Sequence, residues 1–179
     1  MVAADFDVRT GVSPGLTAPE VDGAFDRAMA TWGATSCSSG LSIDETTVFG
    51  DWDIIHGGFI GLPPGVLGVT FPFIWVDGNG PTDIDNDGNF DYAFAFIFYN
   101  SAFPWAIDGN FDVETVALHE AGHGLGQGHF GKAFGTIANG KIHFAPRAVM
   151  NAAYSGVQQS PAGTDNGGHC SIWGSWPQR

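Results

Sequence analysis

The sequence is poor in positive charge: it has six lysines and arginines against nineteen aspartates and glutamates among 179 residues. The formal net charge of -13 provides no basic surface of the kind that binds nucleic-acid phosphates. We therefore expect no nucleic-acid partner. The acidity itself is explained either by a need for solubility or by several aspartates that bind Ca²⁺.

Long apolar runs are also absent, and no stretch is long enough to be a membrane-spanning segment. No secretory signal is visible at the start, which reads Met1-Val2-Ala3-Ala4-Asp5. Hydrophobic residues make up 44% and charged residues 14%, as in a globular protein with a real core. At this length we expect a single domain over residues 1–179.

The most informative stretch that is present reads HEAGHGLGQGH, from His119 to His129. His119 and His123 are four residues apart, so on a helix they share one face and can reach the same metal ion. Gly126 can adopt a positive φ and end the helix, which lets the chain bend back and bring His129 as a third ligand. Three protein ligands with an open fourth position are typical of catalytic zinc.

Glu120 directly follows the first histidine, where it can hold a water beside the metal without being a ligand. We predict that it is a general base. The alternative is an ordinary buried helix with surface histidines, but the glycine and the third histidine in register argue against it.

Residues 116–129 resemble the active-site helix of the metzincin metallopeptidases, most closely the matrixin branch. That family carries a Met-turn beneath the zinc, and residues 148–151 are our candidate, with Met150 as the apolar floor under the histidines. The resemblance implies an α+β, zincin-like fold. It has a mixed twisted sheet, a long backing helix, an active-site helix and a small C-terminal subdomain after the third histidine. We place the upper subdomain at about 1–126 and the lower one at about 127–179.

The chain departs from the matrixin pattern after the third histidine. Phe130 stands where that branch usually has serine, and residues 130–147 form a longer connection to the Met-turn than is usual. These departures concern the branch and leave the three ligands unchanged.

The resemblance implies a secreted, zinc-dependent endopeptidase that cleaves extended protein or peptide substrates. We expect a monomer from which a signal peptide and an inhibitory pro-segment have been removed. Secretion also favours a disulfide between Cys37 and Cys170, although two separate buried thiols are the alternative. Other interpretations are a zinc hydrolase that acts on a different bond, and an inactive zinc- or calcium-binding extracellular module. The intact Glu120 argues against the inactive module.

Local patterns predict several elements. Thr17-Ala18-Pro19-Glu20 has the signature of a capping box, and a helix over 17–33 would place on one face Val21, Phe25, Ala28, Met29 and Trp32. Asp112 is the expected N-cap of the zinc helix, and a short C-terminal helix is expected from Ser160-Pro161. Short strands or strand ends are expected at 6–8, 41–43, 48–49 and 53–55. The segment 92–99 is the strongest strand and should lie inside the sheet.

Residues 65–71 lie between Pro63-Pro64 and Pro72, as suits a strand at a sheet edge. In metzincins such a strand takes substrate as an added antiparallel strand, which makes substrate-binding candidates of Val66, Leu67, Gly68 and Val69. The segment after the Met-turn walls the pocket for the residue that follows the cut bond. Tyr154 is therefore a candidate for lining that pocket or holding the oxyanion, and a packed aromatic is the alternative.

Residues 83–91 match the start of an EF-hand-type calcium loop, with candidate ligands Asp83, Asp85, Asp87, Asn89 and Asp91. Phe94 occupies the twelfth place, where a full EF-hand has glutamate. We expect a structural Ca²⁺ here, and a polar turn closed by its own side chains is the alternative. His56 stands beside two glycines, which is more typical of a satisfied or solvent-facing residue than of a metal ligand.

Overall fold

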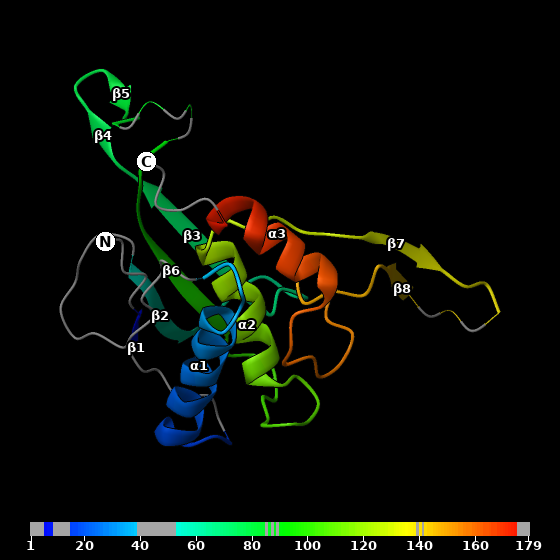
Figure 1. Ribbon diagram of the computed structural model, residues 1–179. Helices are drawn as coiled ribbons and strands as arrows, with labels where there is room; N and C mark the ends of the chain where they lie inside the picture. Colours follow the sequence, from blue (N-terminus) through cyan, green and yellow to red (C-terminus); the bar gives the residue numbers. More distant parts are fainter. Residues whose placement is uncertain are drawn as a thin grey trace.

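The computed structural model describes residues 6–8, 15–38, 53–84, 86, 88, 90–138, 140 and 142–174, and it has a mixed α+β architecture (Figure 1). The main sheet has the order β1-β2-β6-β3, formed by Phe6–Val8, Asp53–Ile60, Tyr92–Asn100 and Gly68–Ile74. Strands β1, β2 and β6 are parallel, whereas β3 is antiparallel to β6 and lies at the edge. The expected inner strand and edge strand are thus confirmed. The strands expected at 41–43 and 48–49 lie outside the described residues.

Helix α1, Ala18–Gly33, begins and ends where the sequence indicates. The backbone N–H and the hydroxyl of Thr17 both donate to the Glu20 carboxylate, at 2.8 and 2.7 Å, and close the capping box. The predicted apolar face is buried and packs against the second helix, α2, Val113–Gly124. At that contact the Trp32 indole N–H donates to the backbone oxygen of Leu118 at 2.8 Å. The backing helix therefore supports the helix that carries the histidines.

The two faces of the main sheet differ because strand side chains alternate. On β6, the buried set Ala93, Ala95, Ile97 and Tyr99 joins the core, while Phe94, Phe96 and Phe98 are half-buried on the opposite face. His56 lies in this core, stacked on Phe25 with ring centroids 4.2 Å apart, and its Nδ1 is 2.7 Å from the Tyr99 hydroxyl. His56 is therefore a buried residue with a hydrogen-bond partner, and the solvent-facing alternative is wrong.

Two strands extend further than the sequence indicates. Strand β2 continues past His56 through two glycines. Gly57 leaves room for the Phe98 ring, which a Cβ at this position would overlap. Gly58 has a positive φ and lies in a bulge, where the register with β6 shifts. Strand β3 begins at Gly68 and passes through Pro72, which was expected to end it. An edge strand tolerates proline because only one side of it is paired.

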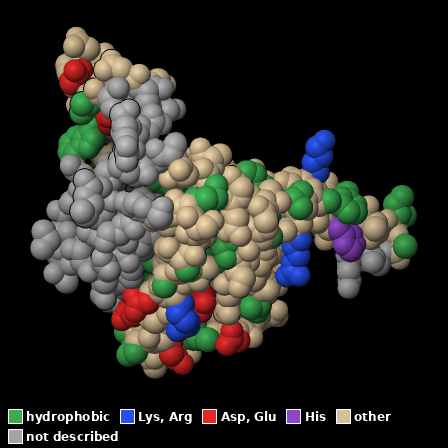
Figure 2. Space-filling model, viewed as in Figure 1, with side chains coloured by type: hydrophobic (Ala, Val, Ile, Leu, Met, Phe, Trp, Pro, Cys, Tyr) green, Lys and Arg blue, Asp and Glu red, His purple; other side chains and the backbone are tan. Residues whose placement is uncertain are grey.

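Two arms project from the body (Figure 1). The first carries β4, Val76–Asp77, and β5, Gly80–Pro81. The second, which we call the β7–β8 arm (residues 132–145), is a hairpin of Lys132–Gly135 and Ile142–Ala145 that the sequence did not indicate. Figure 2 shows hydrophobic side chains towards its far end and lysine or arginine at its base. The last helix, α3, is Gly163–Trp173 and confirms the expected C-terminal helix.

A disulfide joins Cys37, just after α1, to Cys170 on α3, with Cα atoms 5.1 Å apart. The expected pairing is confirmed. The two cysteines are 133 residues apart in the sequence, and the bond fixes the C-terminal helix to the end of the backing helix. No helix in the described ranges is long and apolar enough to cross a membrane.

Removal of this bond should destabilise the fold strongly. For the double variant Cys37→Ala/Cys170→Ala we expect the free energy of unfolding to fall by about 3–5 kcal/mol, because the unfolded chain regains the entropy of a long loop. Urea denaturation measures this quantity. Ser36→Ala, an exposed neighbour, is the control and should shift the free energy by less than about 0.5 kcal/mol. An unchanged midpoint in the double variant would contradict the expectation.

Candidate metal centre and groove

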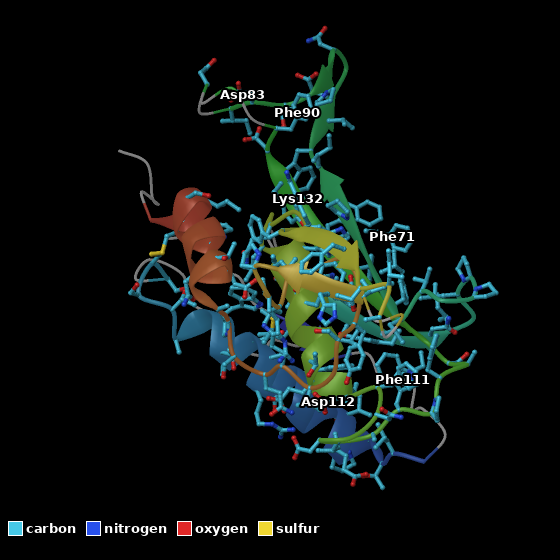
Figure 3. The ribbon with its side chains drawn as sticks, turned by 90° about the vertical axis from the view of Figure 1, so that its right-hand side faces the viewer. Phe71, Asp83, Phe90, Phe111, Asp112 and Lys132 are labelled. Atoms are coloured by element: carbon cyan, nitrogen blue, oxygen red, sulfur yellow. A yellow bond between two sulfur atoms is a disulfide. The ribbon has the colours of Figure 1, made fainter. Side chains whose placement is uncertain are left out.

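Helix α2 begins at a strong N-cap. The buried Asp112 carboxylate accepts from the backbone N–H of Thr115 at 2.8 Å and from its hydroxyl at 2.6 Å. Figure 3 shows Asp112 and Phe111 at this end of the helix. The cap fixes the start of α2, and thereby sets which face His119 and His123 occupy.

The helix ends at Gly124, the residue after its second histidine. Leu125 is the C-cap, and Gly126 has a φ of +85°, the left-handed conformation predicted for it. Beyond this turn, the Nδ1 of His123 donates to the backbone oxygen of Gln127 at 2.7 Å. The turn therefore orients His123 and also carries the chain back towards the helix at His129.

The three histidines converge through their Nε2 atoms. His123 Nε2 lies 3.1 Å from His119 Nε2 and 3.1 Å from His129 Nε2, and the remaining pair is 3.3 Å apart. The ring of His119 is also fixed from behind, because its Nδ1 donates to the backbone oxygen of Val149 at 2.7 Å. Among the described residues, this is the group of three side chains that could hold a metal ion.

The tautomers show why this triad fits a cation. A carbonyl oxygen only accepts, so His119 and His123 carry their protons on Nδ1 and turn the lone pairs of both Nε2 atoms towards each other. A cation bound between the nitrogens would relieve the repulsion between these two lone pairs. Nitrogens bound at about 2.0–2.1 Å to a tetrahedral zinc ion lie about 3.3–3.4 Å apart, close to the separations found here. Burial lowers the pKa of His119 to about 4 and also lowers that of His123. Both rings are therefore uncharged at neutral pH, as a metal ligand must be.

Residues 148–151, the predicted Met-turn, pack against α2. Met150 is fully buried, and a Cβ on Gly122 of α2 would overlap its sulfur, so the helix and the turn are in direct contact. The buried Asp165 carboxylate of α3 accepts from the backbone N–H of Val149 at 2.9 Å and of Met150 at 3.0 Å. Asp165 therefore holds the turn whose Val149 oxygen orients His119. Sequence reasoning missed Asp165, and its first-turn place in the last helix was the available signal.

Glu120 lies under the edge strand and is only 5% exposed. The Thr70 hydroxyl is 2.7 Å from its Oε2, and a Cβ on Gly68 would lie 2.7 Å from its Cγ. Gly68 and Thr70 are two apart on β3, so both face the same carboxylate. Burial raises the pKa of Glu120 to about 7, against the hydrogen bond from Thr70, which lowers it. Thr70 was not predicted from the sequence, because its contact with Glu120 spans fifty residues.

A groove of about 930 Å³ runs past the histidines. One wall is the start of β3 and the loop before it, which includes all four predicted residues Val66, Leu67, Gly68 and Val69. Helix α2, with His119, Glu120 and His123, and the loop that carries His129 form another wall, and residues 151–156 form the third. The fold thus brings the predicted metal ligands, base and strand segment together around one cavity.

Tyr154 also lines the groove. Its hydroxyl accepts from the backbone N–H of Asp112 at 3.0 Å, and its ring stacks against Phe111 with centroids 5.9 Å apart. These contacts engage the hydroxyl at the start of α2. They favour the packed-aromatic interpretation of Tyr154 over a role at an oxyanion.

The candidate calcium loop lies on the arm that carries β4 and β5. Figure 3 shows Asp83 and Phe90 of this loop far from Asp112, which marks the start of α2. Asp83 accepts from the backbone N–H of Gly88 at 3.1 Å, and Asp91 accepts from that of Ile84 at 2.9 Å. These bonds are those of a polar turn. The other candidates, Asp85, Asp87 and Asn89, lie outside the described residues, and calcium binding stays a prediction.

No protein-family model matches the chain, and comparison with curated proteins also finds no match. The chemistry of the site is therefore inferred from its own residues and geometry.

Proposed function

We propose that the protein is a secreted zinc endopeptidase of the metzincin type. The observation that carries this proposal is the convergence of three histidine Nε2 atoms within 3.3 Å of one another. The buried Glu120 directly follows the first of these histidines, and the site lies along a groove bounded by an edge strand. Structural zinc sites are closed by four protein ligands, whereas this triad opens onto a cavity. Such an arrangement suits hydrolysis.

His119, His123 and His129 would hold the zinc ion, whose Lewis acidity polarises a substrate carbonyl and makes a water more acidic. Glu120 accepts a proton from the attacking water and passes it to the amine that leaves as the peptide bond breaks. Thr70 and Gly68 fix the orientation of this carboxylate. The carbonyls of Val149 and Gln127 hold two of the imidazoles in the tautomer that leaves Nε2 free.

Peptides are favoured over other substrates because the groove is bordered by β3. An edge strand presents unpaired backbone groups along its free side, and an extended peptide can pair with them without regard to its side chains. Apolar side chains, among them Phe103, Phe111 and Val116, line the part of the groove near the start of α2. We expect this part to accept an apolar substrate residue.

Several features support membership of the metzincins. They are a mixed sheet with an antiparallel edge strand, a backing helix, a buried methionine packed against α2, and a C-terminal helix. The disulfide suits an oxidising compartment and hence secretion. The β7–β8 arm accounts for the long connection between His129 and the Met-turn. A structural Ca²⁺ on the first arm is part of the proposal.

Two rival functions deserve comparison. A zinc hydrolase for a different bond would share the triad and Glu120, but it would have no need of the edge strand beside the site. A module that only binds zinc would have no need of a buried carboxylate beside the metal. Peptide and ester substrates offered in parallel distinguish the first rival, and the experiment below distinguishes the second.

Metal removal tests the proposal directly. We expect about one zinc per chain by elemental analysis, and cleavage of casein that is lost after treatment with a zinc chelator and restored by added zinc. Calcium is kept constant throughout, so that any effect of the acidic loop stays separate. A zinc-loaded protein that cleaves neither casein nor a peptide library would contradict the peptidase, and a folded protein without affinity for zinc would contradict the metal centre.

A further inference from the structure

The β7–β8 arm is rooted beside the metal centre. His129 lies three residues before it and Val149 lies four residues after it. Its base is clamped by Asn151, whose side-chain N–H donates to the backbone oxygens of Phe130 at 3.0 Å and Pro146 at 3.1 Å. Whatever the arm binds is therefore held next to the groove.

The arm exposes apolar side chains on both of its faces and at its tip. Phe134 pairs across the hairpin with His143, and Gly135 with Ile142, so Phe134 and Ile142 point to opposite faces. Phe134 is 49% exposed, Ile142 is 67% exposed, and Ile137 in the turn is fully exposed. An isolated two-stranded hairpin is only marginally stable in water. These side chains would therefore gain from an apolar environment that surrounds the arm.

Charge is distributed unevenly between this region and the rest of the chain. Residues 121–164 contain no aspartate or glutamate, so all nineteen acidic residues lie elsewhere, yet the region holds three of the six basic residues. Among these, Lys132 begins β7 and Arg147 follows β8, so both lie at the base of the arm, and both are exposed. A local positive region on an acidic protein indicates an anionic partner.

We propose that the β7–β8 arm docks the protein on an anionic lipid surface. Ile137, Phe134 and Ile142 enter the interface, while Lys132 and Arg147 contact lipid phosphates. Four strand residues at about 3.3 Å each span about 13 Å, which suffices to bring the tip about 5–10 Å into the interface with the cations still at the headgroups. The arm also keeps the acidic body at a distance from the like-charged surface.

The arrangement of the arm favours a lipid surface over a protein partner. A protein usually covers one face of a hairpin, whereas a lipid interface surrounds it, and here both faces and the tip expose a large apolar side chain. When the arm is inserted, its apolar tip lies at the acyl chains and its cationic base lies at the headgroups. The inference concerns binding alone and is independent of the proposed peptidase activity.

Co-sedimentation of the full chain with vesicles tests the proposal. We expect binding to phosphatidylcholine vesicles that contain about one third phosphatidylserine, little binding to phosphatidylcholine alone, and weaker binding as salt is raised. Ile137→Ser should lower the association constant for the anionic vesicles about tenfold or more, because one large apolar side chain no longer enters the interface. Lys132→Gln should lower it several-fold.

Ile84→Ser is the matched control, since Ile84 is 76% exposed on the other arm and its loss should not change vesicle binding. Near-ultraviolet circular dichroism and zinc content verify that each variant is folded. Equal binding by the Ile137 and Ile84 variants, or equal binding to both kinds of vesicle, would overturn the proposal. So would an Ile137-dependent self-association without lipid, which would identify a second copy as the occupant. An Ile137-dependent rise in KM for casein without vesicle binding would instead identify a protein substrate, and would equally overturn it.

Discussion

Glu120→Gln is expected to reduce kcat/KM for peptide cleavage by about 10²–10⁴, the usual contribution of a positioned general base. Glutamine has nearly the same shape, so it fits under Gly68 and can still accept the hydrogen bond from Thr70. It cannot accept a proton from the attacking water. Zinc content should stay at that of the wild type, because Glu120 is not among the three converging ligands. Steady-state kinetics on a short peptide and elemental analysis measure both quantities.

Glu114→Gln is the matched control for this variant. Glu114 lies on the same helix and is also buried, but it forms an ion pair with the exposed Arg27 at 2.6 Å and does not line the groove. Its replacement should leave kcat/KM unchanged. Thr70→Val should give an intermediate loss, mainly in kcat, because the carboxylate remains but is less firmly oriented. Retention of more than about a tenth of the activity by Glu120→Gln would refute the role of this residue as the base.

His129→Ala is expected to weaken zinc binding by more than about 100-fold, beyond the 10–100-fold typical of losing an outer partner of a metal site. His129 approaches from the loop after Gly126 and completes the triad with its Nε2 at 3.1 and 3.3 Å from the other two. Two histidines on a helix would remain, with fewer bonds to the ion. Competition with a chromophoric chelator measures the affinity, and peptide cleavage should be lost in parallel at limiting zinc.

His143→Ala is the control for His129→Ala. His143 lies on the β7–β8 arm, where its ring stacks on Phe134 with centroids 5.6 Å apart. Zinc affinity should be unchanged in this variant. If His129→Ala kept the affinity of the wild type, the third ligand would have to be sought elsewhere, and the geometry of the site would have been misinterpreted.

The three candidate metal ligands could be predicted from sequence because they are local. His119 and His123 lie on one helical face by their spacing alone, and the need for a turn at Gly126 follows from the third histidine. The same holds for the capping box of α1 and the N-cap Asp112, since each places a side chain three residues from the group it binds. Interactions over so short a distance depend little on the rest of the fold.

The supports of the site could not be predicted in this way. Thr70 reaches Glu120 across fifty residues, and the Asp165 carboxylate reaches the Met-turn from the last helix. Neither contact belongs to a repeating pattern, because each depends on how β3 and α3 pack around α2. The β7–β8 arm was missed for a related reason: it has few contacts with the core, so no periodic burial marks it in the sequence.

The sequence by itself therefore determined the candidate ligand set, the candidate base and the main helices. Only the tertiary structure decided that Val66–Val69 and the histidines share one groove, that Thr70 and Gly68 fix Glu120, and that an apolar, basic arm stands beside the site. The physical reason is the range of the interactions. Helix periodicity, caps and turns act within a few residues, whereas a groove is formed by packing of segments that are distant in the chain.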